Sequence, residues 1–185
     1  MEWKIDPAHS AIDFSVRYLV ARVHGRFTGL RGQVLLSDPP DGQPPELTSF
    51  DATFDIAGFD TGVPPRNHHV TGKDFLDAAA HPEAKVRLAS LTKDVAPAYL
   101  MTVELTLHGI TRTVDLVAQT AGPVTDSFGI ARAGATATGR LRRSEFGITA
   151  FAGAISDDVE FTVTCKPYPR QSPTTSSRRP TRRVT

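Results

Sequence analysis

The chain has 185 residues and a net charge of +1, from 21 Lys and Arg against 20 Asp and Glu. This length favours one well-buried domain over two small ones. A single cysteine excludes an intrachain disulfide framework. The sequence contains no run of about 18 apolar residues, so we predict no transmembrane helix. The N-terminal residues show no basic segment followed by an apolar one, so we predict no secretory leader and a cytoplasmic location.

The first 56 residues predict extended structure. Residues 3–5 open the chain, and a half-buried strand follows in which apolar and polar side chains alternate. Its apolar face consists of Ile12, Phe14, Val16 and Tyr18. Residues 25–36 contain three glycines and predict a bent or bulged strand of the kind that closes a barrel. A third strand alternates from Phe50 through Phe54 to Ile56.

Residues 60–80 break the β pattern. Pro64 and Pro65 end any strand, and Thr71 with Asp74 three residues later resembles a capping box. We therefore expect a short helix near residues 62–80, with Phe75 on its apolar face.

The second half of the chain predicts five strands. The clearest pair is a β-hairpin over residues 102–117, where alternation stops at His108-Gly109 and then resumes. Gly109 can supply the positive φ that such a bend needs. The other strands are predicted around residues 86–88, 128–141 and 159–165. Eight strands, one short helix and no βαβ spacing indicate an all-β antiparallel barrel or sandwich.

The C-terminal residues differ in composition from the rest. Residues 166–185 hold six Lys and Arg and no acid, which leaves 15 basic against 20 acidic residues on 1–165. We predict a domain at 1–167 and a basic disordered tail at 168–185. Without interleaved aromatic residues the tail predicts no specific nucleic-acid binding, whereas a peripheral membrane contact through it and a homodimer stay open.

One predicted strand bears on the interior of a barrel. Its small residues share one face: Ala131, Ala133, Ala135, Ala137 and Gly139. If that face points inward, the side chains on one wall of the barrel are too short to reach its axis. This favours a narrow apolar cavity for one slim ligand. Filling of the gap by bulky residues on facing strands is an equal alternative. The facing walls would bring Phe14, Val16, Phe54, Ile56, Val103, Leu105 and Phe161.

Four motifs, in order, resemble the YceI-like proteins. They are W-K-I-D-P-A-H-S-A-I-D-F-S-V-R, R-N-H-H-V-T-G-K-D-F-L-D, L-T-L-H-G-I-T-R-T-V-D-L and R-S-E-F-G-I, and they span residues 3–149. The resemblance implies an eight-stranded lipocalin-like barrel that binds a polyisoprenoid or an isoprenoid quinone in its pore, with no catalytic activity and no cofactor. This chain differs from the family pattern at Tyr18, Asn67 and Ala135, where relatives often carry His, Asp and an aromatic residue, respectively.

Carried onto this chain, the resemblance places the Arg-x-x-His motif at Arg66 and His69, where they meet a ligand headgroup or tie residues 60–80 to the barrel. His9 and His108 also match family positions, and we expect both to be hydrogen-bonded near turns. The predicted ligand-binding residues are Phe14, Val16, Tyr18, Phe54, Ile56, Arg66, His69, Phe75, Val103, Leu105, Ala135 and Phe161.

Two other functions stay open, a lipid-modifying hydrolase or isomerase and a filled barrel that serves as an interaction scaffold. The chain has no nucleophile elbow, P-loop or dinucleotide motif, so we predict that it is not an enzyme. No metal site is predicted, because adjacent His68 and His69 point apart on an extended segment. Cys165 falls on an inward face, which indicates an inert packed thiol.

Overall fold

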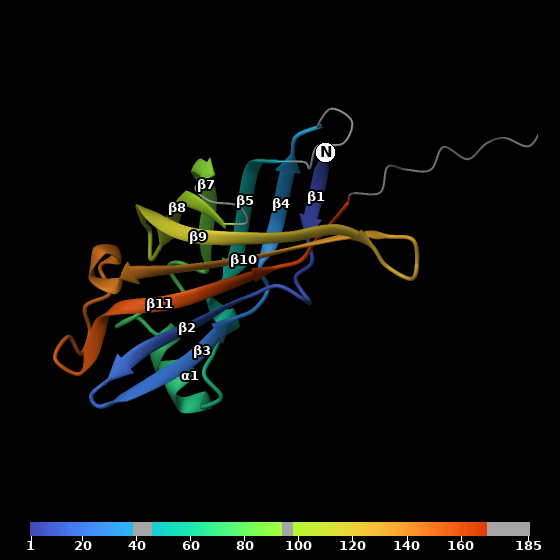
Figure 1. The fold of residues 1–185 in the computed structure, drawn as a ribbon. Coiled ribbons are helices and arrows are strands. Elements are labelled where there is room, and N and C mark those ends of the chain that lie inside the picture. The colour runs from blue at the N-terminus through green and yellow to red at the C-terminus, as the bar shows by residue number, and fades with distance from the viewer. Residues whose placement is uncertain (39–45, 94–97, 170–185) are drawn as a thin grey trace, which may run out of the picture.

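Antiparallel pairing organises nearly all of the chain (Figure 1). The computed structural model describes residues 1–38, 46–93 and 98–169. The strands are β1 (Glu2–Ile5), β2 (Ala11–Tyr18), β3 (Ala21–Phe27), β4 (Arg31–Leu36), β5 (Leu47–Asp55), β6 (Phe59–Asp60), β7 (Glu83–Lys93), β8 (Ala98–Leu107), β9 (Ile110–Thr125), β10 (Ala131–Arg142), β11 (Ile155–Cys165) and β12 (Pro167–Pro169). The helical elements are α1 (Pro64–Thr71) and two 3-10 turns, η1 (Ile56–Gly58) and η2 (Arg143–Phe146).

One sheet contains twelve strands, in the order β12-β1-β4-β5-β7-β8-β9-β10-β11-β2-β3-β6. The all-β class is confirmed, but the expected count of eight strands is wrong. The predicted strand over residues 25–36 is two strands, β3 and β4, separated by residues 28–30. Three short strands, β1, β6 and β12, account for the rest of the difference.

The sheet curls into a barrel because the chain bends between β3 and β4. β3 pairs with β2, and β4 pairs with β5 on the other side of the bend. Counted as one bent run, β3 and β4 complete a ring with β2, β5, β7, β8, β9, β10 and β11. β6 then pairs with β3, placing Phe59 opposite Phe27. The steep strands β4 and β5 therefore cross the level strands β9, β10 and β11 in Figure 1.

The hairpin predicted over residues 102–117 is confirmed, and strands β8 and β9 form it. Leu107 pairs with Ile110, and the turn consists of His108 (φ 52°) and Gly109 (φ 74°). Two positive φ angles match the right-handed twist of the flanking strands. Glycine is also required here by space, because a Cβ on Gly109 would lie 2.7 Å from the ring of His81.

Helix α1 exists within the predicted residues 62–80, but the predicted start at a Thr71 capping box is wrong. The helix begins at Pro64, since proline lacks the N–H that the first helical position leaves unpaired. Thr71 is its last residue, and its hydroxyl donates back to the carbonyl of Asn67 at 2.9 Å. The turns that follow bury Phe75 and Leu76.

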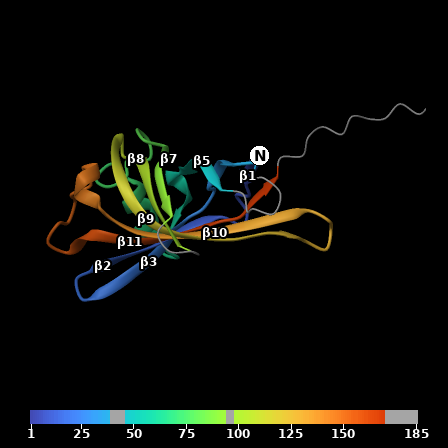
Figure 2. The ribbon, with the colours of Figure 1, turned by 45° about the horizontal axis from the view of Figure 1, so that its top comes forward.

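The two ends of the sheet extend differently. β12 pairs with β1 through Pro169, two residues past the expected domain limit. Residues 170–185 of the predicted tail lie outside the described residues. The tip of the β9–β10 hairpin projects beyond the barrel in both ribbon views (Figure 1, Figure 2). Among the described residues, no helix has the length and apolar character needed to cross a membrane.

Candidate functional site

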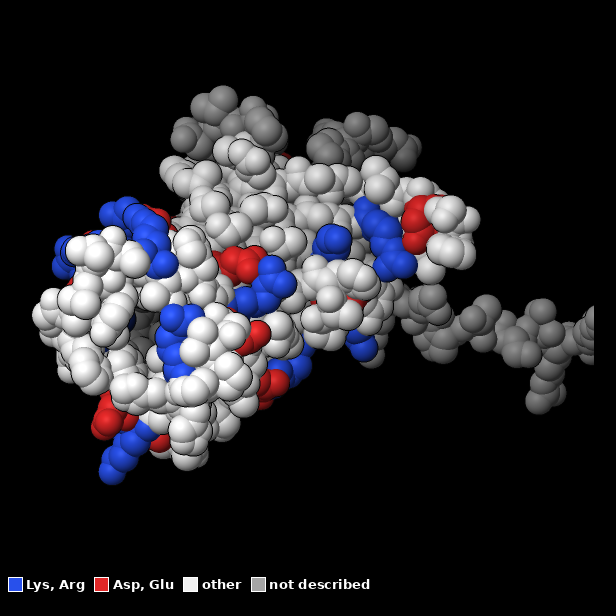
Figure 3. All heavy atoms as spheres, turned by 90° about the horizontal axis from the view of Figure 1, so that it is seen from below, with Lys and Arg blue, Asp and Glu red and all other residues white. Residues whose placement is uncertain are grey.

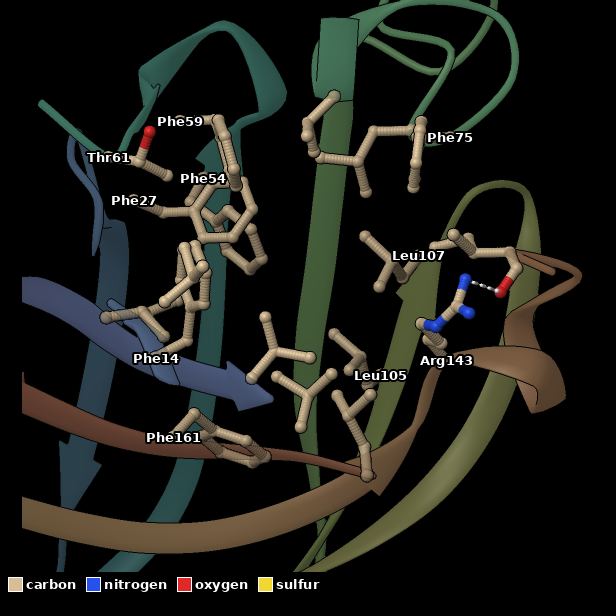
Figure 4. Close-up of a pocket in the computed structure, with 18 of the residues that line it drawn as sticks. Phe14, Phe27, Phe54, Phe59, Thr61, Phe75, Leu105, Leu107, Arg143 and Phe161 are labelled. Atoms are coloured by element: carbon tan, nitrogen blue, oxygen red, sulfur yellow. Dashed lines mark hydrogen bonds between the residues drawn. The ribbon is translucent and has the colours of Figure 1, made fainter. Parts of the chain in front are cut away.

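The barrel encloses an apolar cavity of about 490 Å³ (Figure 4). This volume lies within the range of about 300–1,000 Å³ that is typical of small-molecule sites. Strands β2, β3, β5, β7, β8, β9 and β11 supply its walls together with Phe59 of β6 and Leu141 of β10, and α1 and the segments after α1 and η2 supply its rim. One wall is aromatic, with neighbouring rings of Phe14, Phe27, Phe54 and Phe59 centred 5.0 to 5.7 Å apart.

Most of the predicted ligand-binding residues lie on this cavity. They are Phe14, Val16, Tyr18, Phe54, Arg66, His69, Phe75, Val103, Leu105 and Phe161. Ile56 and Ala135 do not line it. Ile56 starts η1 instead of ending a strand, and its side chain is fully buried in the core. Ala135 pairs with Thr120 and Cys165, away from the cavity.

The alanine face of β10 points inward, but it does not form the cavity wall. The buried residues that do not line the cavity include Trp3, Val34, Met101, Ala118, Ala137 and Cys165. Bulky Trp3 and Met101 thus share the core with small side chains at this filled end. Gly139 of β10 packs closely behind the cavity wall, because a Cβ there would lie 2.5 Å from Leu116 and 2.8 Å from Phe161, which both line the cavity. Both predicted outcomes therefore occur, with one part of the interior filled and another hollow.

The cavity opens to solvent at a hollow seen from below (Figure 3), with uncharged atoms around it and basic atoms beside it. Tyr18 and Phe151 line the cavity and remain 46% and 57% exposed, which places both at this mouth. Phe151 stacks on Phe75 with ring centres 5.8 Å apart, and His69 meets both rings edge-on. Three rings from three segments therefore form one side of the mouth.

Arg66 ties α1 to the barrel and also lines the cavity. Its Nε donates to the Thr61 hydroxyl at 2.8 Å, and one Nη donates to the Thr61 carbonyl at 3.0 Å. Asn67 accepts from the Thr61 N–H and donates to Asp60 at 2.7 Å. Hydrogen bonds from the Gly62 N–H and from Asn67 lower the pKa of Asp60. A neutral Asn67 fits here, whereas an aspartate would place a second negative charge against Asp60.

Arg143 is a cavity residue that the sequence analysis missed. Arg143 is 6% exposed, and its guanidinium donates to four backbone carbonyls at 2.7 to 3.1 Å, one of which is drawn in Figure 4. Those carbonyls belong to Ile148, Ala150, Ile155 and Ser156. Burial lowers the pKa of Arg143, and the nearby Asp157 opposes this shift. Arg143 therefore fixes the segment that carries Phe151 to the mouth.

The polar groups of the cavity are mainly hydrogen-bond donors. No aspartate or glutamate within the described parts of the chain lines it, whereas Arg66 and Arg143 do. The arrangement suits a ligand with an apolar body and an oxygen acceptor at one end. Thr61 with Arg66 is a polar pair within hydrogen-bond reach, but a guanidinium cannot take the proton from a hydroxyl and so does not create a nucleophile.

The other candidate reactive groups serve as structural contacts. His9 pairs with Asp6 at 2.8 Å, a partner that the sequence analysis did not identify. The hydroxyl of Ser10 is buried and accepts from the Lys166 N–H at 3.0 Å. Burial raises the pKa of Cys165 to about 12, so its thiol stays protonated and unreactive near neutral pH.

Comparisons with known proteins agree with this architecture. A family model described as the YceI-like domain matches residues 3–166. A UPF0312 protein of Pectobacterium atrosepticum is 30% identical over 165 residues, covering 88% of this chain and 83% of that protein. The crystal structure of BcnA from Burkholderia cenocepacia superposes with a TM-score of 0.73 at 21% identity, over 88% of this chain and 98% of that one. A polyisoprenoid binding domain from Saccharophagus degradans gives a TM-score of 0.66 at 15% identity, over 91% and 98%.

Proposed function

This chain belongs to the YceI-like domain family, and from that premise we propose that it binds a long-chain isoprenoid-type lipid, a polyisoprenoid or an isoprenoid quinone. The observation that carries the proposal is the apolar cavity of about 490 Å³ with an open mouth. The description of the Saccharophagus degradans domain as polyisoprenoid binding supports the same ligand class. In this function the chain of the lipid occupies the barrel, and its polar end lies near Arg66 and His69.

Burial of the lipid chain dominates the expected affinity. Each buried CH₂ contributes about 0.8 kcal/mol, so a dozen carbons give roughly 10 kcal/mol before the costs of association. A single polar contact at the mouth adds about 1 kcal/mol net. The apolar walls therefore set the strength of binding, and the donors at the mouth set which end of the lipid enters.

The proposal is tested by extraction of bound lipid from the freshly purified protein, followed by titration with lipids of one headgroup and increasing chain length. Affinity should rise about fourfold for each added CH₂ until the cavity is full, and then level off. A protein without extractable lipid and with no dependence on chain length would contradict a lipid-binding function. Conversion of the added lipid would instead favour the hydrolase or isomerase alternative.

Arg66 is expected to contribute little to affinity. Arg66→Ala should weaken lipid binding by about tenfold or less, because it removes one polar contact and leaves chain burial intact. Arg87, whose side chain is 72% exposed on the outer face of β7 and does not line the cavity, provides a control in which Arg87→Ala leaves affinity unchanged. A loss of three decades in a calorimetric titration of Arg66→Ala would mean that the headgroup, not the chain, dominates binding.

The mouth also carries exposed apolar side chains that fit a membrane surface. Leu19 and Val20 form the β2–β3 turn, where they are 54% and 101% exposed, and the Leu19 N–H bonds to Ala154 in the Phe151 segment. A lipid that leaves a membrane directly into the cavity avoids exposing its chain to water. We therefore infer that this rim contacts the membrane during loading, while the predicted contact through the tail concerns residues outside the described part.

Val20→Asp is expected to slow lipid transfer from vesicles by about tenfold, because one isopropyl group that would enter the bilayer contributes roughly 1.5 kcal/mol or more. Equilibrium affinity for dispersed lipid should stay unchanged. Phe128, 85% exposed at the β9–β10 tip, gives the matched control Phe128→Asp. Equal slowing of transfer in both variants would exclude the rim as the contact surface.

A further inference from the structure

Two segments bring a carboxylate and two imidazoles together beside the cavity. Asp77 and His81 lie in the turns after α1, and His108 lies in the β8–β9 turn. All three side chains are partly buried, and one potential ligand atom from each lies within 4.8 Å of the others. Sequence spacing did not suggest this cluster, because the histidines belong to different segments.

The ring of His108 is held in the orientation that a metal ligand needs. Its Nδ1 lies 3.0 Å from the carbonyl oxygen of Phe146, so Nδ1 carries the proton and donates. Nε2 is then left with a free lone pair, and metal-binding histidines are commonly fixed by this kind of bond to a backbone carbonyl. The His81 ring lies 4.9 Å away, centre to centre, at 67° to it. Gly109 makes room for that ring.

The backbone also holds the cluster at some cost. Asp77 has φ 45° and His108 has φ 52°, positive angles that few residues other than glycine adopt, although aspartate and histidine adopt them more often than most. Asparagine or glycine suits the first position of such a hairpin turn better than histidine does. In addition, the His81 N–H bonds to the Asp77 carbonyl at 2.8 Å, which sets the two residues one turn apart on the same side. Strained backbone at converging polar side chains is typical of a binding site.

We propose that Asp77, His81 and His108 bind a divalent transition-metal ion, with Zn²⁺ preferred. Two imidazoles and one carboxylate are ligands that suit zinc, whereas calcium and magnesium prefer all-oxygen sites. Zinc bonds of about 2.0–2.2 Å in tetrahedral geometry place two ligand atoms about 3.4 Å apart, so side-chain rotations must bring the three ligand atoms, now within 4.8 Å of one another, closer together. The fourth position of a tetrahedral ion would hold water.

Such a site has a structural consequence for the cavity. Phe75 and Leu76 directly precede Asp77, Leu107 directly precedes His108, and all three apolar residues line the cavity. A bound ion would therefore connect the segment after α1 to the β8–β9 hairpin. These two parts of the cavity wall are distant from each other in the sequence. The inference concerns a second site and holds whichever lipid the cavity takes.

Titration of the chelator-treated full chain with Co²⁺ and Zn²⁺ tests the site. Co²⁺ should develop the visible absorption of a tetrahedral complex at one equivalent, and Zn²⁺ should displace it and raise Tm. His81→Asn and Asp77→Asn should each weaken binding by at least about tenfold to a hundredfold, the loss that removal of a hydrogen-bond partner of a ligand alone causes. His68→Asn and His24→Asn, which remove histidines outside the cluster, should leave binding unchanged.

The outcomes separate a built site from surface binding. If His81→Asn binds Co²⁺ as tightly as the unaltered chain, or if His68→Asn and His24→Asn lose as much affinity, the ion binds elsewhere and the assignment is wrong. Circular dichroism of His81→Asn checks that the barrel is intact. If that variant does not fold, Asp77→Asn provides the same comparison.

Discussion

Leu105→Trp is expected to lower the affinity for a long-chain lipid by at least about a hundredfold. Leu105 is almost fully buried and projects into the cavity from β8 (Figure 4). An indole there would take the place of roughly four methylene groups of ligand, which contribute about 3 kcal/mol together. Because the new ring grows into empty space, the free energy of unfolding should change by only about 1–3 kcal/mol.

Val117 provides the matched control for this substitution. It lies on the neighbouring strand β9 with its side chain on the outer face, 46% exposed. Val117→Trp adds the same ring without entering the barrel, so lipid affinity should stay as it was. Fluorescence titration with a long-chain lipid compares the two variants, and unchanged affinity in folded Leu105→Trp would mean that the ligand does not occupy the cavity.

Arg143→Leu is expected to reduce the free energy of unfolding by about 3–5 kcal/mol or to prevent folding. The substitution leaves the four carbonyls that now accept from the guanidinium without this donor, in a buried to part-buried region. Arg143→Lys should lie between, because an ammonium retains the charge but cannot reach all four oxygens. Urea denaturation followed by circular dichroism measures the differences.

The neighbouring residue supplies the comparison. Arg142 precedes Arg143 at the end of β10, and its side chain is exposed. Arg142→Leu should therefore change the free energy of unfolding by no more than about 0.5 kcal/mol. Similar losses in the Arg142 and Arg143 variants would show that the carbonyl contacts do not stabilise the fold.

The sequence predicts the long strands well and the short ones poorly. Alternation over residues 102–107 identified most of β8, and the His108-Gly109 turn identified its partner β9. A two-residue strand such as β6 has no period to detect, and its pairing with β3 depends on the curl of the whole sheet. For α1, Pro64 was interpreted only as the end of a strand, although proline also suits the first position of a helix.

The sequence predicts which side chains point into the barrel, but not which of them line the cavity. Period-two patterning shows that both Leu105 and Ala135 point inward, yet it cannot show which of them lies where the barrel is hollow. That difference depends on packing across the barrel, where buried Trp3 and Met101 belong to the filled part and Leu105 lines the open one. Arg143 was missed for a related reason, since its partners are backbone carbonyls of a segment whose course no side-chain pattern records.

The division of the interior into a filled end and a hollow end separates two kinds of evolutionary freedom. Around Trp3, Ala137 and Cys165, a change of side-chain volume disturbs close packing and threatens folding itself. Around Val16, Phe161 and the mouth, the same change alters the shape of a void and leaves most of the protein's own contacts intact. Related proteins with this barrel can therefore change their ligand preference through substitutions at the hollow end, while the filled end maintains the fold.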